Sequence, residues 1–268
     1  MISPYSSDLE LTQKTHNLFR LRTNDTYQGF MITQILKENN IFKPYLLYIN
    51  NSWGNIMLDA VTKYCKVYNI EIQKTLAYNE INEDLLTEIM KIENELDEAS
   101  TNREHTGIIT LSLLEITDII NQIERNSSLF KIPWFTTEAV TFRSFTPVFK
   151  DNPSENYQQI ELYCPKLRPV TANHPGVEES YYALTGSKLD YTQAARYDAA
   201  WIYALSVISQ GTIDVHQISK VIPIVSADYI GLLGVCKFNS HNDKLSADYN
   251  IVRYNHVDNS FIDVTLVT

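Results

Sequence analysis

The stretch YLLYINNSWGNIMLDAVTKYCKV, residues 45–67, decides the fold class of this chain. Residues 45–49 form a short apolar run that is rich in aromatic side chains and stops at two asparagines, as a buried strand does. From Ile56 to Val67 the apolar residues return at helical spacing. A strand, a polar loop and an amphipathic helix in this order predict one repeat of an α/β sheet.

The same alternation continues on both sides of this stretch. The further segments, in chain order, are a helix within Tyr27–Lys37, a strand at Ile70–Ile72, a helix at Leu85–Leu96, a strand at Gly107–Leu111, a helix at Ile116–Ile123 and a strand entered through Phe130–Phe135. Short connections between such elements are typical of a parallel, doubly wound sheet. A sheet of this kind binds ligands beyond the carboxyl ends of its strands, which indicates residues 50–54, 111–115 and 136–138.

The pattern changes after about residue 160. A long helix is predicted at Thr192–Ser209 and a short one near Val215–Val221, and the last forty residues alternate around a turn at Asp258-Asn259. This region is too poor in parallel strands to cover the apolar faces of its own helices. We therefore expect that the beginning of its domain is missing from the chain before Met1.

Composition excludes several classes of function. The chain has 268 residues, 44% of them hydrophobic, and a formal net charge of −10 without a basic cluster. Such a balance argues against nucleic acid and against a charged membrane surface as partners. The three cysteines, Cys65, Cys164 and Cys236, are far apart and are interpreted as small buried side chains rather than zinc ligands or a disulfide framework. No apolar run is long enough to span a bilayer.

Signatures of catalysis and of cofactor binding are also missing from the sequence. It contains no phosphate-binding glycine loop and no nucleophile elbow, and its six histidines form no pair at helical spacing. We therefore expect no metal, no cofactor and no enzyme, although a nucleophile and its base can come together from distant positions.

Three residues are candidates by position. Trp53 follows a predicted strand and can form the wall of a cleft or pack under a loop. Glu138 also follows a strand, where a carboxylate can pair with a ligand ammonium or be a solvated surface group. Asp198 lies in an apolar helix and needs a partner, for which a local structural contact is favoured over a ligand.

Several segments in this order resemble the type I periplasmic binding proteins, the extracellular solute receptors of branched-chain amino-acid ABC transporters. The segments are Ile2-Ser3-Pro4 with the polar residues after it, Phe19-Arg20, Gln28-Gly29, the strand and loop of 45–57, ARYDAAWIYALSVI at 195–208, and GLLGVCKFNSHNDKLSADYNIVRY at 231–254. The resemblance covers nearly the whole chain. It implies an α/β fold with two lobes and parallel doubly wound sheets, one lobe being incomplete.

The resemblance also assigns the chain to lobes. Residues 1–22 would be the end of lobe one, 23–163 lobe two, 164–248 the continuation of lobe one, and 249–268 strands returning to lobe two. Carried over by position, the ligand-binding residues are Tyr5, Ser6, Ser7, Trp53, Glu138 and Asp198. In this scheme Ser7 holds a ligand carboxylate, the backbone of the two residues before it lines the site, Trp53 is an aromatic wall, and Glu138 takes the ammonium.

The chain departs from the family pattern at a few positions. Tyr5 is bulky where many relatives have alanine, which can shrink the pocket or change the ligand. Phe238-Asn239 and Asn242-Asp243 replace aspartate- and glycine-containing pairs, although asparagine tolerates a left-handed turn as glycine does. The strand end at Leu111–Leu114 lacks an aromatic residue that relatives often have there. A branched-chain amino acid is therefore not assured as the ligand.

The function implied is that of an extracellular solute-binding protein, which captures a small polar ligand between its lobes for uptake by an ABC-transporter permease. The ligand would be an amino acid or an amide-like molecule. The expected location is extracellular or periplasmic, with anchoring to a membrane through a segment before Met1 as one arrangement. The alternatives are a ligand-sensing receptor or regulator module of the same fold and, less favoured, an α/β enzyme.

Overall fold

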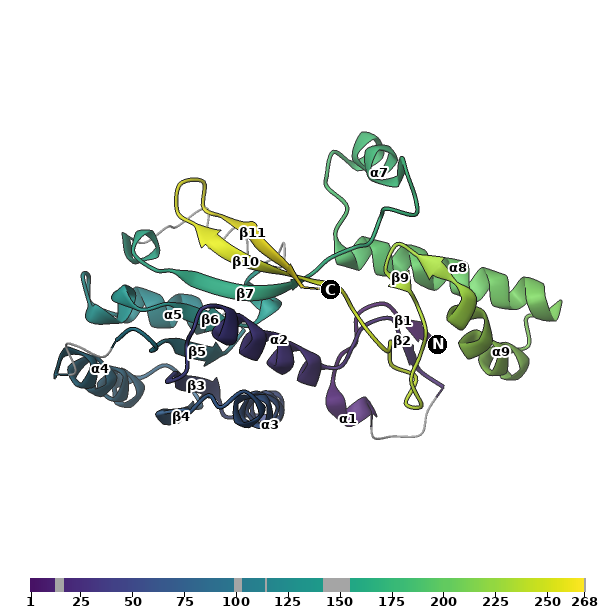
Figure 1. The fold of residues 1–268 in the computed structure, drawn as a ribbon. Helices are drawn as coiled ribbons and strands as arrows, with labels where there is room; N and C mark the ends of the chain where they lie inside the picture. The colour runs from purple at the N-terminus through teal and green to yellow at the C-terminus, as the bar shows by residue number, and fades with distance from the viewer. Residues whose placement is uncertain (13–16, 99–102, 114, 142–154, 268) are drawn as a thin grey trace. The chain divides into compact units, whose positions relative to one another are not determined.

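The computed structural model describes residues 1–12, 17–98, 103–113, 115–141 and 155–267 (Figure 1). The chain divides into two compact units, which we describe separately. Unit 1 contains Met1–Asp25 and Leu167–Tyr249, and unit 2 contains Thr26–Lys166 and Asn250–Val267. The lobe boundaries given above remain a prediction.

Unit 2 is built on a seven-stranded sheet, which reaches the unit boundary at two of its strands. Across the sheet, the strands are β11 (Ser260–Val267), β10 (Tyr249–Asn255), β7 (Leu162–Leu167), β6 (Trp134–Thr136), β5 (Ile108–Leu111), β3 (Tyr45–Ile49) and β4 (Lys74–Tyr78). The pairs from β4 through β3, β5 and β6 to β7 are all parallel. The expected α/β class with a parallel sheet is confirmed.

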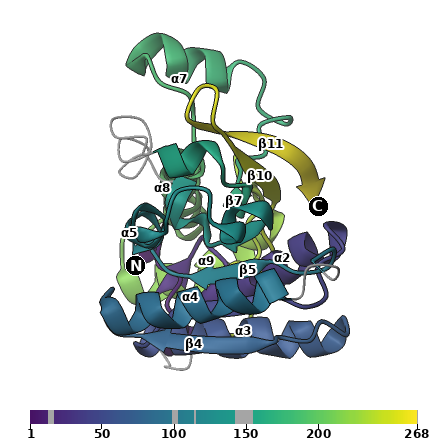
Figure 2. The ribbon, with the colours of Figure 1, turned by 90° about the vertical axis from the view of Figure 1, so that its left-hand side faces the viewer.

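Side chains that alternate along each strand enter two separate cores. Leu46, Ile109 and Phe135 pack with helices α2 (Asp25–Glu38) and α3 (Ser52–Val67). Their chain neighbours Leu47, Ile108 and Trp134 pack with α4 (Glu83–Glu98) and α5 (Glu115–Gln122). Figure 2 shows α4 at full length above β4. Helices therefore cover both faces of the sheet, which leaves the strand ends as the edge open to a ligand.

Two features of unit 2 differ from the sequence prediction. Ile70–Ile72 is not a strand, since β4 begins at Lys74. Ile70 is 5% exposed and belongs to the core beside α3, so its apolar character reflects a packed connection. Strand β7 was not predicted, because Pro165 lies inside it and proline lacks the N–H that a strand donates.

The turn between β3 and α3 requires a glycine at position 54. The Asn51 side chain caps α3 by accepting a hydrogen bond of 2.8 Å from the Gly54 N–H. A Cβ added at Gly54 would lie 1.8 Å from the carbonyl oxygen of Ile49. The helix thus starts directly against the end of the strand, which holds the side chain of Trp53 near the sheet edge.

We predict that Gly54→Ala lowers the free energy of unfolding by about 1–3 kcal/mol, as overpacking of a filled site does. Chemical denaturation monitored by circular dichroism measures the change. Asn55→Ala is the matched control, because Asn55 is exposed on the same helical turn and should change stability by less than about 0.5 kcal/mol. Equal stability of the two variants would contradict the close approach to Ile49.

Unit 1 contains mainly helices and short strands. Its elements are β1 (Ile2–Ser3), α1 (Leu9–Thr12), β2 (Phe19–Arg20), α7 (Val177–Thr185), α8 (Tyr191–Gln210), α9 (Val215–Asp228), β8 (Ile230–Gly231) and β9 (Gly234–Val235). Strands β1 and β2 pair in parallel and β8 and β9 antiparallel. Helix α8 packs against α9 but exposes apolar side chains, among them Trp201 at 45% and Ile208 at 74%. Helix α7 was not predicted; it is only 9 residues long and none of its residues is buried.

Searching the described residues gives no helix that is both long and apolar enough for a membrane span.

Candidate functional site

The polar edge of unit 2 lies at the carboxyl ends of β5 and β6. The hydroxyl of Thr137 donates a hydrogen bond of 2.8 Å to the carbonyl of Ser112, which ties the two strand ends together. Glu138 follows at the start of a 3-10 turn (Glu138–Thr141) and is only 2% exposed. Its backbone N–H donates to the side-chain oxygen of Gln28, at 2.8 Å. Hydrogen bonds of Thr137 and of the Glu138 N–H therefore hold the backbone that carries this carboxyl group. Because Glu138 is buried, the alternative of a solvated surface carboxylate does not apply.

Trp53 lies beyond the end of β3, in the first turn of α3. It is partly buried and packs against the core that α2 and α3 share. Strand β5 separates β3 from β6, so Trp53 and Glu138 both belong to the carboxyl edge but follow strands that are not neighbours. Leu114, which falls in the second predicted stretch (residues 111–115), lies outside the described residues.

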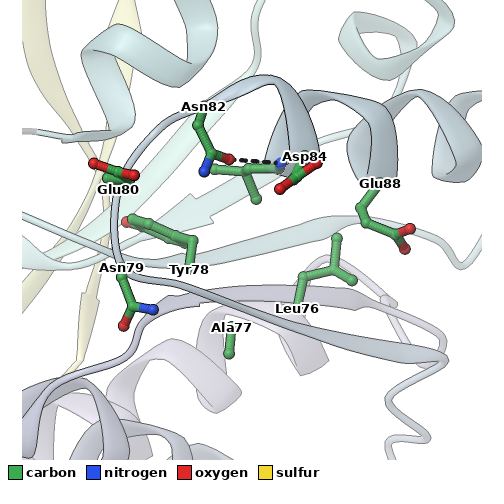
Figure 3. A pocket seen from close by; sticks show the side chains of 9 residues that line it. Leu76, Ala77, Tyr78, Asn79, Glu80, Asn82, Asp84 and Glu88 are labelled. Atoms are coloured by element: carbon green, nitrogen blue, oxygen red, sulfur yellow. Dashed lines mark hydrogen bonds between the residues drawn. The ribbon is translucent and has the colours of Figure 1, made fainter.

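A hollow of about 230 Å³ lies at the end of the edge strand β4 (Figure 3). The acidic side chains of Glu80, Asp84 and Glu88 line it, together with Tyr78 and the loop into α4. Glu88 forms ion pairs with Lys74, at 3.0 Å, and with Lys91, and hydrogen bonds to these lysines lower its pKa. No cluster suited to a metal ion occurs among the residues that the structure describes. We assign this hollow no ligand.

In unit 1, the polar loop after β1 is held by local hydrogen bonds. Ser3 Oγ accepts from the N–H of Ser6 at 3.1 Å, and Asp8 Oδ1 accepts from the N–H of Glu10 at 2.8 Å. The carbonyl of Ser7 accepts from the N–H of Asp25 at 3.1 Å. The structure thus brings Tyr5, Ser6 and Ser7 into one ordered loop next to Asp25, a residue that the sequence analysis did not select.

Charged groups lie beside this loop. Asp25 is 6% exposed, and its burial raises the pKa of the carboxyl group, while the positive charge of Arg22 and a hydrogen bond with the Ser7 side chain act in the opposite direction. Burial also raises the pKa of the Tyr5 phenol, and Arg22 opposes this shift. Neither Arg22 nor Asp25 could be chosen from sequence, because each is an ordinary polar residue until the chain brings them beside the loop.

A buried ion pair connects the two ends of unit 1. Arg20 is 0% and Asp243 1% exposed, and their side chains meet at 2.5 Å between Nε and Oδ1. Thr12 completes the group by donating to Asp243 Oδ2 at 2.9 Å and accepting from Arg20. Asn242 has a φ of 63°, so the expectation that asparagine serves as the left-handed residue here is confirmed.

Asp198 holds the turn between β8 and β9. Its side chain is 0% exposed and accepts hydrogen bonds from the Tyr229 hydroxyl at 2.9 Å and from the backbone N–H groups of Leu232 and Leu233 at 2.9 and 2.8 Å. Burial raises the pKa of this carboxyl group and the donors partly offset the shift. A Cβ on Gly231 would lie 2.2 Å from Asp198 Oδ1. This geometry matches the local structural contact that the sequence favoured.

The three cysteines are free and buried, as their sequence interpretation expected. Burial raises the pKa of the Cys65 thiol to about 12. The Sγ atom of Cys236 lies 3.6 Å from Asp198 Oδ2 and belongs to the same buried group.

Comparison with known proteins places this chain in a family. The model of the receptor family ligand binding region matches residues 1–257. A relative from Methanocaldococcus jannaschii, the uncharacterized protein MJ1266, is 22% identical over 246 residues, which are 87% of this chain and 58% of that protein. The chain therefore spans less than two thirds of the length of this relative.

Solved structures show the same fold. The leucine binding protein LivK from Thermotoga maritima has a TM-score of 0.77 at 13% identity and covers 100% of this chain and 73% of its own. LivJ from Streptococcus pneumoniae, in complex with isoleucine, has a TM-score of 0.72 at 15% identity, with 99% and 72% covered. A substrate-binding protein from Desulfitobacterium hafniense, in complex with Leu, has a TM-score of 0.72 at 16% identity, with 98% and 72% covered. The expected type I fold is confirmed, and the chain belongs to the receptor family of ligand binding regions.

Proposed function

We propose that this chain is part of a solute-binding protein, which captures a small polar molecule on the outer side of a membrane and delivers it to an ABC-transporter permease. The observation that carries the proposal is the family match over residues 1–257, together with a fold shared with transporter proteins that hold leucine or isoleucine. These solved structures are described as substrate-binding proteins in complex with Leu or isoleucine, so we propose binding without catalysis.

In unit 2 we assign Glu138 to the ligand ammonium, because a carboxylate that is 2% exposed forms a strong charge-assisted hydrogen bond. Trp53, at the end of β3 on the same sheet, is assigned to an apolar part of the ligand. In unit 1 we assign Ser7 to the ligand carboxylate, for which its hydroxyl would exchange its hydrogen bond with Asp25 for one with the ligand, and we assign the backbone of Tyr5 and Ser6 to the same group. Asp198 is left out of the contacts, since its oxygens already accept several hydrogen bonds within the unit.

We predict that Glu138→Gln and Ser7→Ala each weaken binding by about 1–3 kcal/mol, the cost of losing a buried hydrogen bond. A thermal-shift screen over amino acids, amides and short organic acids identifies the ligand, and calorimetry then measures its affinity for each variant. Glu80→Gln and Ser209→Ala are the controls, because these side chains are exposed and lie outside the assigned contacts. An affinity equal to that of the wild type removes the changed residue from the site.

Ligand sensing is a second candidate, which the family description as a receptor region favours. Uptake of the labelled ligand by cells with and without this gene distinguishes the two functions. Loss of uptake supports transport. Normal uptake with a lost cellular response to the ligand supports sensing.

A further inference from the structure

An arginine stacks against the only aromatic side chain of the unit 1 loop. The Arg22 Cζ atom lies 5.0 Å from the centroid of the Tyr5 ring, within the range of a cation–π contact. Arg22 is 5% exposed, whereas Tyr5 is 38% exposed. One face of the ring is therefore supported by a buried cation, and part of the ring remains open to solvent on the loop that carries Ser7.

Carboxylates around Arg22 hold its guanidinium group in position. The Asp25 carboxylate, which is 6% exposed, interacts with the charge of Arg22 and receives a hydrogen bond from the Ser7 side chain. The charges of Asp25 and Asp190 also act on the Tyr5 phenol, and those of Asp8 and Arg20 act on Asp25. Asp190 itself accepts from the N–H groups of Thr192 and Gln193 at the start of α8. A buried cation with carboxylates nearby cannot leave at low cost, so it is a rigid support for the ring.

Because Tyr5 lies on the loop that carries Ser7, a Tyr5 ring held in place by Arg22 would restrict the side chain of the ligand. The Tyr5 ring contacts Arg22, whose charge acts on Asp25, and Asp25 is hydrogen-bonded to the Ser7 side chain that we assign to the ligand carboxylate. Through these shared neighbours, the phenol takes up volume near the place assigned to that carboxylate. Because the α-carbon of an amino acid carries both its carboxylate and its side chain, a group placed next to the carboxylate restricts the side chain. A tyrosine without support could rotate to another staggered χ1 position and make room.

We propose that Arg22 is a positioning residue that holds the Tyr5 ring over the ligand loop, and that this ring makes the site select amino acids with short side chains over branched aliphatic ones. The selection rests on the proposed function, whereas the stack between the two residues does not.

The first test measures side-chain preference by calorimetry, with glycine, alanine and serine against valine, leucine and isoleucine. We expect wild-type protein to bind the best short amino acid at least tenfold more tightly than any branched one. Tyr5→Ala should reduce this ratio at least tenfold. Arg22→Met, which removes the charge but keeps an unbranched chain, should reduce the ratio in the same direction, and Arg22→Lys should restore part of it. Arg196→Ala, at an exposed arginine of α8, should leave the ratio unchanged.

The second test observes the ring directly and needs no ligand. With 3-fluorotyrosine incorporated at position 5, ¹⁹F NMR follows the resonance and the titration of this phenol. Since Arg22 lowers the pKa of Tyr5 by its charge and by a hydrogen bond, Arg22→Met should move the titration to higher pH, and Arg196→Ala should not.

The outcomes separate the two proposals. An unchanged ¹⁹F titration in Arg22→Met overturns the stack. A changed titration with equal weakening of all ligands, or with no change in preference, overturns the role in selection. Wild-type protein that binds none of the amino acids overturns the selection together with amino-acid capture, and the fluorine titration still decides whether Arg22 supports the ring.

Discussion

Arg20→Ala should lower the free energy of unfolding by about 3–5 kcal/mol, because it leaves the carboxylate of Asp243 buried without its ionic partner. Asp243 is 1% exposed and receives its shortest hydrogen bond, 2.5 Å, from Arg20. Arg20 also donates to the carbonyl of Asp8 at 2.5 Å, so the substitution additionally releases the start of α1. Urea denaturation, with circular dichroism and tryptophan fluorescence as two probes, measures the loss and shows whether unit 1 unfolds separately.

Two further variants test the cause of this loss. Arg253→Ala is the matched control, because Arg253 is 44% exposed and its Nη1 lies 3.6 Å from Glu161, a geometry worth at most about 1 kcal/mol. Arg20→Met combined with Asp243→Leu removes both charges and should recover much of the stability. If the double variant is as unstable as Arg20→Ala, the unpaired carboxylate is not the cause.

Asp198→Ala should also cost about 3–5 kcal/mol, since it leaves two backbone N–H groups and one hydroxyl without their acceptor in a buried place. The affected donors belong to Leu232, Leu233 and Tyr229. Thermal unfolding followed by calorimetry measures the loss. Asp228→Ala removes an exposed carboxylate at the end of α9 and should change stability by less than about 0.5 kcal/mol.

Ligand affinity distinguishes a structural from a binding role for Asp198. At a temperature where Asp198→Ala is still folded, its affinity for the ligand should stay close to that of the wild type. A stable variant that has lost binding would return Asp198 to the ligand contacts that the family resemblance assigned to it.

The fold could be predicted where local pattern and packing agree. The strands at 45–49 and 108–111 are short apolar runs that both cores bury, and the helices around them have apolar stripes at the right spacing. The prediction was wrong at Ile70–Ile72, where apolar residues pack from a connection, and it missed β7, which contains Pro165. In both segments, long-range packing outweighs local preference.

The candidate site also contains residues that could be predicted from sequence and contacts that could not. Trp53 and Glu138 could be placed from sequence, since the end of a parallel strand is a local feature. The hydrogen bond between Gln28 and Glu138 joins residues 110 positions apart, and the stack of Arg22 on Tyr5 depends on the path of the chain after β2. No spacing rule predicts such pairs, because neither residue type nor local pattern determines which distant segments meet.

The ion pair of Arg20 with Asp243 has a consequence for synthesis of the chain. Its partners are 223 residues apart, whereas strands β3 to β6 of unit 2 pair within residues 45–136. During synthesis on the ribosome, the middle of the sheet can form while Arg20 is still solvated, because Asp243 has not yet been synthesised. Unit 1 therefore cannot be completed before residue 243 has emerged, and a chain that stalls earlier would carry an assembled sheet centre together with an unfinished first unit.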